Sequence, residues 1–481
     1  MLIDIVYPAS NTGSDNYSSE PPLGIVALFS SLPENYQKNV RFLDSTIMSQ
    51  VEIEDSVEER KAGIIALSCT TYNYSNAIRV AEIAKTNGAF IICGGIHITH
   101  RRDAILKKMQ KGERAIDFLI TGYGEPAFTK LITSLIYGLS FETIPNLSYI
   151  KNGQIIINHL DNRKCGADPL DKPMDYSKID FAKYSSHFKP QGNLNNVKIV
   201  GSTYTQRGCS YTGNKKCTFC SIEHLNLCRS AKLFEQDVLS LITIYNVDHV
   251  RIADADFTAS LKHMSRIAEA ANRVFNQTGI RPVFHCFARA DEINPQTINI
   301  LQCLNAVSLF VGYESGSNRM LKSMNKHITI EENIQATLLL KNYGIEIIAG
   351  SYVFGAEGED ETTLSETMDF INKIKEINNT RTMMATPLIP LPGSLCFNKL
   401  LEKLKQEDLL RFIKLNAEDD FDLDELIELW NYYFCNVSLS RLIEVCEQVE
   451  KILPASIRLI NINGKIREKT AYNKPICCHE G

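Results

Sequence analysis

The strongest chemical signal in the chain is a group of three closely spaced cysteines. Cys209, Cys217 and Cys220 lie in the segment GSTYTQRGCSYTGNKKCTFCSIEH (201–224), with seven residues between the first two and two between the last two. Thiolates bind soft metals, and two cysteines three positions apart can face one metal centre from a single turn. Structural zinc sites and ferredoxin-type clusters usually have four protein ligands, so three cysteines favour a [4Fe–4S] cluster with one iron open.

Two other interpretations of these cysteines remain open from spacing alone. A zinc ion could be bound by the three thiolates together with His224 or Cys228. Cysteine is also a common small buried residue, and the chain has 14 of them, so some serve only in packing.

Size and composition predict a globular protein of two or three domains. Of 481 residues, 44% are apolar and 22% are charged, and the net charge of −5 gives no broad basic surface for nucleic acid. No apolar run reaches the roughly 18 residues of a membrane span, and MLIDIVYPAS lacks the features of a signal peptide. With cysteines scattered through a long chain, we expect a cytoplasmic protein with reduced thiols.

Residues 1–135 alternate apolar strand segments with amphipathic helical segments, as in LIDIVYP followed by PPLGIVALFSSL. This order predicts a Rossmann-like, doubly wound parallel sheet, in which ligands bind beyond the carboxyl ends of the strands. Small residues that would let a large ligand approach the backbone stand at those ends: Ser68, Thr70, Gly94, Gly95, Gly122 and Gly124.

Residues 136–195 predict a connecting region. LSYIKNGQIII (147–157) has the pattern of a hairpin that turns at Asn152–Gly153, and the Asp- and Pro-rich stretch after it is typical of an extended linker.

Residues 196–395 contain six further strand segments separated by helical ones, which predicts a partial (β/α)6 barrel of the TIM type. The chemistry of such a barrel gathers at the carboxyl ends of its strands. Polar residues there include Asp256, Arg289, Glu314 and Ser351, whereas His285 is expected to be a core residue. Residues 396–481 are helix-rich and could cap the barrel or simply pack against it. The fold class is therefore α/β with a helical C-terminal segment.

The cysteine loop resembles the cluster loop of the radical S-adenosylmethionine (SAM) superfamily, whose usual spacing is C-x3-C-x2-C with an aromatic residue before the third cysteine. Phe219 matches that aromatic position, although the first gap here is four residues longer. ARADEI, GYESGSNRMLKSMNK, VFGAEGEDETT and PLIPLPGS resemble the strand-end motifs of the family, in the same order. The resemblance implies a [4Fe–4S] cluster on the three cysteines and bound SAM. It further implies that Phe219, Asp256, Arg289, Glu314 and Ser351 lie near SAM or substrate, with Arg289 and Glu314 as catalytic candidates.

Residues 1–135 resemble the cobalamin-binding domain attached to many radical SAM enzymes. The resemblance rests on PPLG (21–24), GGIHIT (94–99) and TGYGEP (121–126). It implies cobalamin at the glycine-rich strand ends, and the absence of a D-x-H-x-x-G pattern implies cobalt without a protein imidazole. His97 and His100 are then expected in a loop or at the surface. Alternatively, the domain has lost the cofactor and serves as an interaction module.

Together these resemblances imply cobalamin-dependent methyl transfer to an unactivated carbon of a small-molecule or peptide substrate, with an electron donor such as flavodoxin or ferredoxin. Two alternatives remain. The same cofactors could support cyclisation, rearrangement or oxidation without methyl transfer, or the chain could be a non-catalytic, zinc-stabilised binding or regulatory protein.

Overall fold

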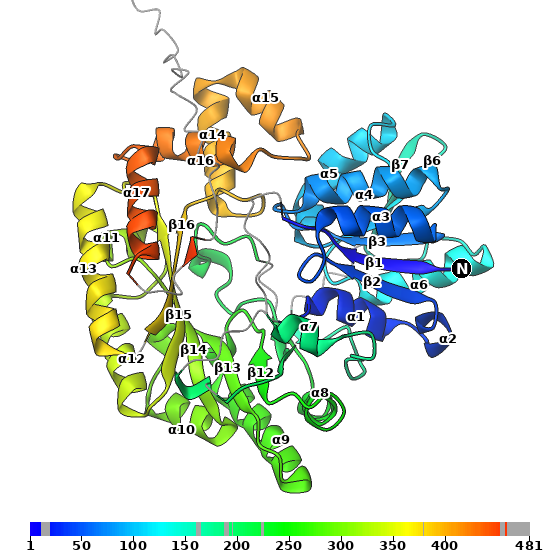
Figure 1. The fold of residues 1–481 in the computed structure, drawn as a ribbon. Helices are drawn as coiled ribbons and strands as arrows, with labels where there is room; N and C mark the ends of the chain where they lie inside the picture. Colours follow the sequence, from blue (N-terminus) through cyan, green and yellow to red (C-terminus); the bar gives the residue numbers. More distant parts are fainter. Residues whose placement is uncertain are drawn as a thin grey trace, which may run out of the picture.

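The computed structural model describes residues 1–10, 20–159, 165–186, 192–194, 196–222, 226–378, 380–452 and 457–458. Two α/β units lie side by side, each built on a seven-stranded sheet, and helices from the C-terminal segment lie above the junction between them (Figure 1).

The first unit is the doubly wound sheet that the alternating pattern predicts. Its parallel strands run in the order β2-β1-β3-β4-β5, which places a topological switch point between β1 and β3. The strands are β1 (Ile3–Tyr7), β2 (Val40–Asp44), β3 (Ile64–Ser68), β4 (Phe90–Gly94) and β5 (Phe118–Ile120). Helices α1 (Leu23–Ser31), α2 (Glu34–Gln37) and α6 (Glu125–Tyr137) belong to one apolar layer, and α3 (Gln50–Arg60), α4 (Tyr74–Thr86) and α5 (Ile96–Gln110) to the other.

The predicted hairpin forms, but it belongs to this sheet and not to a connecting region. Strands β6 (Leu147–Lys151) and β7 (Gln154–Ile157) extend the sheet antiparallel beyond β5, so the first unit continues past residue 135. The turn residues Asn152 and Gly153 have φ of 51° and 74°, as a two-residue hairpin turn requires. Leu147 and Tyr149 are buried, so joining the edge of β5 removes their apolar surface from water.

The connection to the second unit lies between β7 and the first barrel strand and contains short elements of its own. It contains β8 (Cys165–Ala167), α7 (Phe181–Ser185) and the turn Gly192–Leu194. β8 pairs with β11 (Asn226–Cys228), which pairs with β10 (Gln206–Arg207), so the linker runs beside the cysteine loop.

The second unit is an open barrel of six parallel strands in sequential order, as predicted, with a short seventh strand at one edge. The strands are β9 (Val200–Thr203), β12 (His249–Ile252), β13 (Val283–Ala288), β14 (Ala306–Glu314), β15 (Glu346–Phe354), β16 (Thr380–Pro387) and β17 (Ile457–Arg458). Helices cover the outer face (Figure 1): α8 (Ala231–Thr243), α9 (Leu261–Thr278), α10 (Pro295–Leu304), α11 (Asn318–Ser323), α12 (Ile330–Asn342), α13 (Glu361–Ile377) and α17 (Leu439–Glu450). A small apolar cluster around Leu194 and Val200 closes the base.

The C-terminal helices α14 (Leu395–Glu407), α15 (Leu409–Ala417) and α16 (Leu423–Phe434) contact both units. On the barrel side, Trp430 Nε1 donates to the carbonyl of Gly355 at 2.8 Å. On the other side, the loop between α15 and α16 places the fully buried carboxylate of Asp419 between Arg114 (2.7 Å for both hydrogen bonds) and the hydroxyl of Tyr74 (2.9 Å).

This docking corrects the expectation for His97. The side chain is 1% exposed, stacks on Tyr74 with ring centroids 4.3 Å apart, and lies 2.7 Å from the carbonyl of Asp419. The C-terminal segment covers α5, so a residue that looked like a loop residue in sequence is buried between distant parts of the chain.

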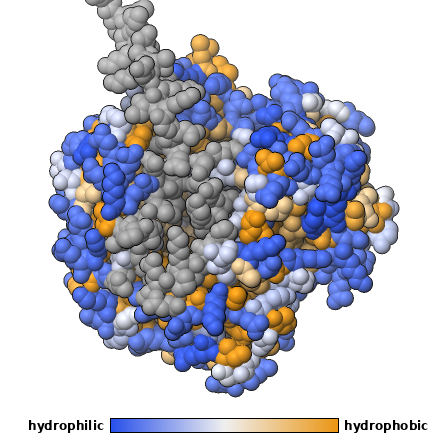
Figure 2. Space-filling model, in the orientation of Figure 1, coloured by the Kyte–Doolittle hydropathy of each residue, from blue (hydrophilic) through white to orange (hydrophobic). Residues whose placement is uncertain are grey.

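The coloured part of the surface in Figure 2 is mostly hydrophilic, with hydrophobic residues scattered between hydrophilic ones. Among the helices that the structure describes, none combines the length and apolarity needed to cross a membrane.

We predict that Asp419→Asn lowers the free energy of unfolding by about 3 kcal/mol, because it leaves Arg114 beside a buried neutral group. Burial by itself raises the pKa of Asp419, but the hydrogen bonds and charge of Arg114 more than offset this and hold it below its ordinary value. The stabilisation should therefore be present above about pH 4 and disappear as the pH falls through the lower folded-state pKa.

Urea unfolding at pH 7 and pH 3 measures both effects. Glu142→Gln is the matched control, because its ion pair with Lys151 is exposed on both sides and should contribute less than about 1 kcal/mol. Equal losses for the two variants at pH 7 would contradict this account of the docking.

Candidate functional site

The cysteine loop follows β9 and β10 and is held at its centre by the chain after α11. Thr218 N–H donates to the carbonyl of Met324 at 3.0 Å, and Asn325 Nδ2 donates to the carbonyls of Asn214 and Lys216 at 2.8 Å each. Cys220 N–H closes a turn onto the carbonyl of Cys217 at 3.3 Å. The longer first gap is therefore an ordered loop with its own anchors.

The three predicted cysteines come together in this loop. All three are partly buried, and the charges of Cys217 and Cys220 both act on Cys209. Burial raises the pKa of Cys209 to about 11 and also raises that of Cys220. The thiols of Cys209 and Cys220 are therefore protonated at neutral pH and must release protons when a metal binds.

The described residues contain no group of three Cys, His, Asp or Glu side chains close enough to hold a single metal ion. In an iron–sulfur cluster each cysteine binds a different iron, so the thiolates stand further apart than around one zinc ion. The proposed zinc ligand His224 lies outside the described residues. Cys228 lies on β11, where the charges that act on its thiol come from Asp254, Arg266 and Asp168 and not from the loop cysteines.

Two of the predicted strand-end residues form one contact group at the barrel mouth. Glu314 ends β14 with a positive φ of 63°, accepts a hydrogen bond from Ser351 at 3.2 Å, and pairs with the buried Lys326 at 2.8 Å. A Cβ at Gly312 would lie 2.5 Å from the Glu314 carboxylate, so a larger residue there would displace that side chain. Lys326, which sequence reasoning missed, brings a positive charge toward Cys217 and Cys220.

Arg289 lies between that group and the cysteine loop. Its guanidinium lies 3.7 Å from the ring centroid of Tyr211, pairs with Asp291 at 3.0 Å and donates to the carbonyl of Lys326 at 2.5 Å. Tyr211 also donates to Asp291 at 2.7 Å. Arg289 and Glu314 are therefore each in an ion pair, but with different partners, Asp291 and Lys326.

Asp256 is buried and belongs to a pair of neighbouring carboxyl groups, with the partly buried Glu292. The hydroxyl of Thr258 lies 3.3 Å from Asp256 Oδ1 and 2.6 Å from Glu292 Oε2. Burial, together with the neighbouring carboxyl, raises the pKa of Glu292 well above its ordinary value, so the two groups share a proton at neutral pH. Sequence analysis did not single out Glu292.

A cavity of about 440 Å³ lies at the carboxyl edge of the first sheet, where the sequence predicts a ligand. Its lining includes five of the six predicted residues: Ser68, Gly94, Gly95, Gly122 and Gly124. The sixth, Thr70, is not among the lining residues, and its N–H instead donates to Asn73 Oδ1 at 2.7 Å. A Cβ at Gly95 would lie 2.5 Å from the carbonyl of Cys69, and its φ of 107° also favours glycine.

The same cavity reaches the cysteine loop. Ser221 and Ile222, directly after Cys220, form part of its lining. His100 Nε2 lies 2.9 Å from the carbonyl of Ser221, so α5 of the first unit contacts this loop. His100 was expected in a loop or at the surface, but it is a half-buried helical residue at this junction.

Arg207, two residues before Cys209, forms a second contact between the two units, in addition to that of His100. It pairs with Glu125 at 2.6 Å and with Asp168 at 3.2 Å, and Tyr123 and Tyr204 lie within 5 Å of its guanidinium. Sequence analysis did not single out Arg207. The TGYGEP motif, which carries Tyr123 and Glu125, was the available signal.

Phe219 packs away from this junction. It is partly buried against an apolar cluster that includes Met320, Met324 and Phe397, so its packing helps to fix the loop on the C-terminal helices. His285 is a buried core residue, as expected, 2.6 Å from His249.

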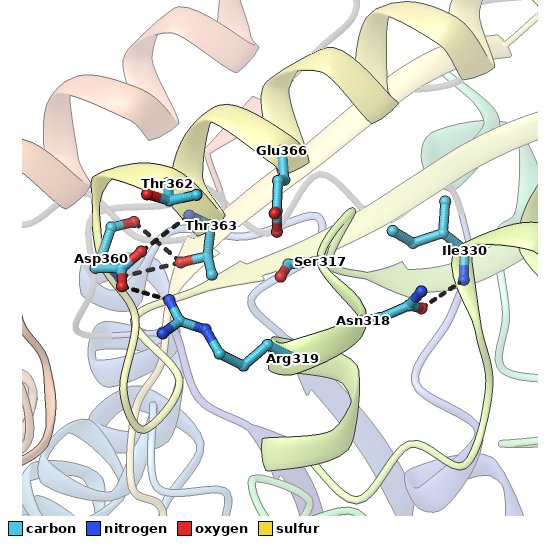
Figure 3. Close-up of a pocket in the computed structure, with 8 residues that line it drawn as sticks. All are labelled: Ser317, Asn318, Arg319, Ile330, Asp360, Thr362, Thr363 and Glu366. Carbon is cyan, nitrogen blue, oxygen red and sulfur yellow. Dashed lines mark hydrogen bonds and ion pairs between the residues drawn. The ribbon is translucent and has the colours of Figure 1, made fainter.

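A second, shallower hollow of about 330 Å³ lies at the start of α13 (Figure 3). Arg319 crosses it to pair with Asp360, and Ser317 and Glu366 also line it. It contains none of the residues that the sequence predicts for the site.

Two family models match the chain. The B12 binding domain matches residues 15–132, and the Radical SAM superfamily matches residues 203–371.

The chain is 25% identical to an uncharacterized methyltransferase of Pyrococcus horikoshii over 76% of each chain. It is 22% identical to the anaerobic magnesium-protoporphyrin IX monomethyl ester cyclase of Rubrivivax gelatinosus, over 91% of this chain and 78% of that one. A structural neighbour is the radical SAM methyltransferase TsrM of Kitasatospora setae with cobalamin and a [4Fe–4S] cluster bound (TM-score 0.64, 16% identity, 84% of this chain and 75% of that chain covered).

A B12-binding unit followed by an open radical SAM barrel defines an enzyme class. The chain belongs to the radical SAM superfamily, in the branch that carries an N-terminal B12-binding domain.

We predict that Glu292→Gln flattens the pH dependence of stability. Because the folded protein holds a proton on this pair that the unfolded chain loses near pH 4.3, the free energy of unfolding should fall as the pH rises above that value. The slope for one proton is at most about 1.4 kcal/mol per pH unit. Glutamine mimics the protonated acid and removes that dependence. Urea midpoints between pH 5 and 8 measure it, with the exposed Glu361→Gln as control; parallel curves for all three proteins would refute the shared proton.

Proposed function

We propose that the chain is a cobalamin-dependent radical SAM enzyme in which Cys209, Cys217 and Cys220 hold a [4Fe–4S] cluster. The observation that carries this proposal is the shared cavity: residues directly after Cys220 and the glycine-rich strand ends of the B12-binding unit line the same space. Reactive groups held on the two units would therefore lie next to each other. When bound, these cofactors supply reductive cleavage of SAM to a 5′-deoxyadenosyl radical, and methyl chemistry at cobalt.

The chain's own groups would bind and orient SAM at the barrel mouth. Glu314 and Ser351 offer hydrogen-bond acceptors and donors to a polar ligand, and Arg289 and Lys326 supply positive charge beside the cysteine loop. Asp256 and Glu292 share a proton beside the loop, so this pair can donate to or accept from a polar ligand. Positioning and exclusion of water are the tasks left to the protein in such a site.

The first-unit cavity suits part of a large, amide-bearing cofactor. Its glycines let a planar ring approach the backbone, and Glu125 Oε2 is buried without a hydrogen-bond partner among the described residues. The amide side chains of a corrin are donors that such an oxygen can accept. Ser68 and Thr99 add hydroxyl groups to the lining, and none of the lining residues is a histidine.

We further propose that the reaction transfers a methyl group to an unactivated carbon of a small-molecule or peptide substrate. The similarity to the Pyrococcus horikoshii methyltransferase supports this. The similarity to the Rubrivivax gelatinosus cyclase supports the second candidate, radical ring closure without methyl transfer. An assay for S-adenosylhomocysteine beside 5′-deoxyadenosine separates them, because methyl transfer consumes a second SAM.

An electron donor such as flavodoxin or ferredoxin and a cytoplasmic location complete the proposal. Both fit a labile cluster on reduced thiols, and the eleven cysteines whose side chains the structure describes are free.

Replacing any one of Cys209, Cys217 and Cys220 by alanine should abolish SAM cleavage, because the cluster loses a ligand. The measurement is 5′-deoxyadenosine formation after anaerobic reconstitution with iron and sulfide, together with iron content. Cys303→Ala is the matched control, since this exposed thiol lies at the outer end of α10 and should retain both. Full activity of a loop variant, or zinc without iron in the purified protein, would refute the cluster.

Gly24→Phe should block cobalamin binding without unfolding the chain. Gly24 lines the first cavity, and a Cβ there would meet no atom within 4 Å, so a large side chain can project into the empty space. Hydroxocobalamin retention, followed by its visible spectrum after gel filtration, should fall by tenfold or more. Gly24→Ala is the control and should bind normally; equal retention by both variants would place the cofactor elsewhere.

A further inference from the structure

The inner face of the barrel carries a charged residue that the site described above does not use. Along β12, Val250 and Ile252 are fully buried in the core that packs under the outer helices. Because side chains alternate along a strand, Arg251 between them faces the interior of the barrel, here called the lumen. Its side chain is 29% exposed, so the lumen is open to solvent at this point.

An aromatic surface lies beside this arginine. The guanidinium carbon of Arg251 is 4.9 Å from the ring centroid of Phe287, and the rings of Phe287 and Phe310 are 4.6 Å apart. These two residues are paired on neighbouring strands and both are only half-buried. Buried aromatic residues normally lose most of their surface, so a half-exposed pair inside a barrel offers apolar contact area to a ligand.

The protein leaves the charge of Arg251 incompletely matched. Arg251 Nη1 donates a hydrogen bond to Glu20 Oε2, a residue of the first unit, at 2.9 Å. Arg251 Nε is buried and has no partner among the described residues. By contrast, Arg289 and Lys326, nearer the mouth, are each held by a carboxylate of their own unit.

We propose that Arg251 binds an anionic group of the substrate, a carboxylate or a phosphate, while Phe287 and Phe310 contact an apolar or aromatic body attached to it. This rests on the proposed function and names the substrate class for the same barrel. A guanidinium can hold either anion through two parallel hydrogen bonds, and a site that excludes water strengthens them. Glu20 then acts as the counter-charge that the substrate anion displaces or shares.

Small aromatic probes can test this on the full-length, anaerobically reconstituted protein. Equilibrium dialysis with labelled phenylacetate and phenyl phosphate should show saturable binding, whereas benzyl alcohol and phenylethylamine should bind at least tenfold more weakly. The tighter of the two acids identifies the anion. Equal binding of all four probes, or no binding of either acid, would overturn the proposal.

Substitutions of Arg251 and of Glu20 should change the affinity for the acids in opposite directions. Arg251→Gln should weaken binding of the preferred acid tenfold or more, Arg251→Lys should restore part of it, and Glu20→Gln should strengthen it several-fold by removing the competing carboxylate. Phe310→Ala should weaken both acids alike. Arg273→Gln is the matched control, because this arginine pairs with Glu235 on exposed outer helices and should leave binding within twofold of wild type.

The same preparations separate this proposal from the proposed function. SAM cleavage with dithionite and no substrate depends on the cysteine loop and should persist in Arg251→Gln. A wild-type protein that cleaves SAM but binds the acids no better than Arg251→Gln would overturn the lumen assignment alone. If Arg251→Gln fails to fold, the other two variants still test the proposal. Arg251→Lys should bind the preferred acid more weakly than wild type and Glu20→Gln more tightly. Unchanged affinity in both variants would overturn the role of Arg251.

Discussion

The contacts between the first unit and the cysteine loop are the constraint on which the rest of the site depends. Arg207 precedes Cys209 by two residues and is buried in an ion pair with Glu125, at the start of α6. On the other side of the loop, His100 of α5 contacts the carbonyl of Ser221, directly after Cys220. Breaking a largely buried ion pair by removing one partner typically costs about 3–5 kcal/mol, so this contact stabilises the junction between the two units.

This arrangement has a direct chemical consequence. The strand ends of the first sheet and the cysteine loop line the same cavity, so a ligand of one unit touches the other. The C-terminal segment also contacts both units away from the cavity. Asp419 pairs with Arg114 of the first unit, and Trp430 donates a hydrogen bond to Gly355 of the barrel. Reactions that pass a group between two cofactors need such fixed spacing, because small displacements are costly in rate.

Charge at the barrel mouth is arranged around the same loop. Lys326 and Arg289 bring positive charge beside Cys217, and Lys326 also acts on the buried thiol of Cys220. This charge favours the thiolates that a metal requires. Asp256 and Glu292, also at the barrel mouth, share a proton. The mouth therefore carries less negative charge than its number of carboxyl groups suggests. The mouth therefore suits polar ligands, while the lumen below it combines Arg251 with aromatic surface.

The sequence by itself determined the two sheet types, the cysteine loop, the glycine-lined strand ends and the rim residues, because strand periodicity and short motifs are local properties. Only the tertiary structure decided which residues meet across long separations. The hairpin after residue 135 joined the first sheet because β5 offered an open edge, and His97 was buried because residues more than 300 positions away cover it. Thr70 ended outside the cavity since its N–H serves a local turn. Arg207, Lys326 and Glu20 could not be assigned from the sequence, because the carboxylates or charges that they face lie on other segments, and no local pattern encodes such partners.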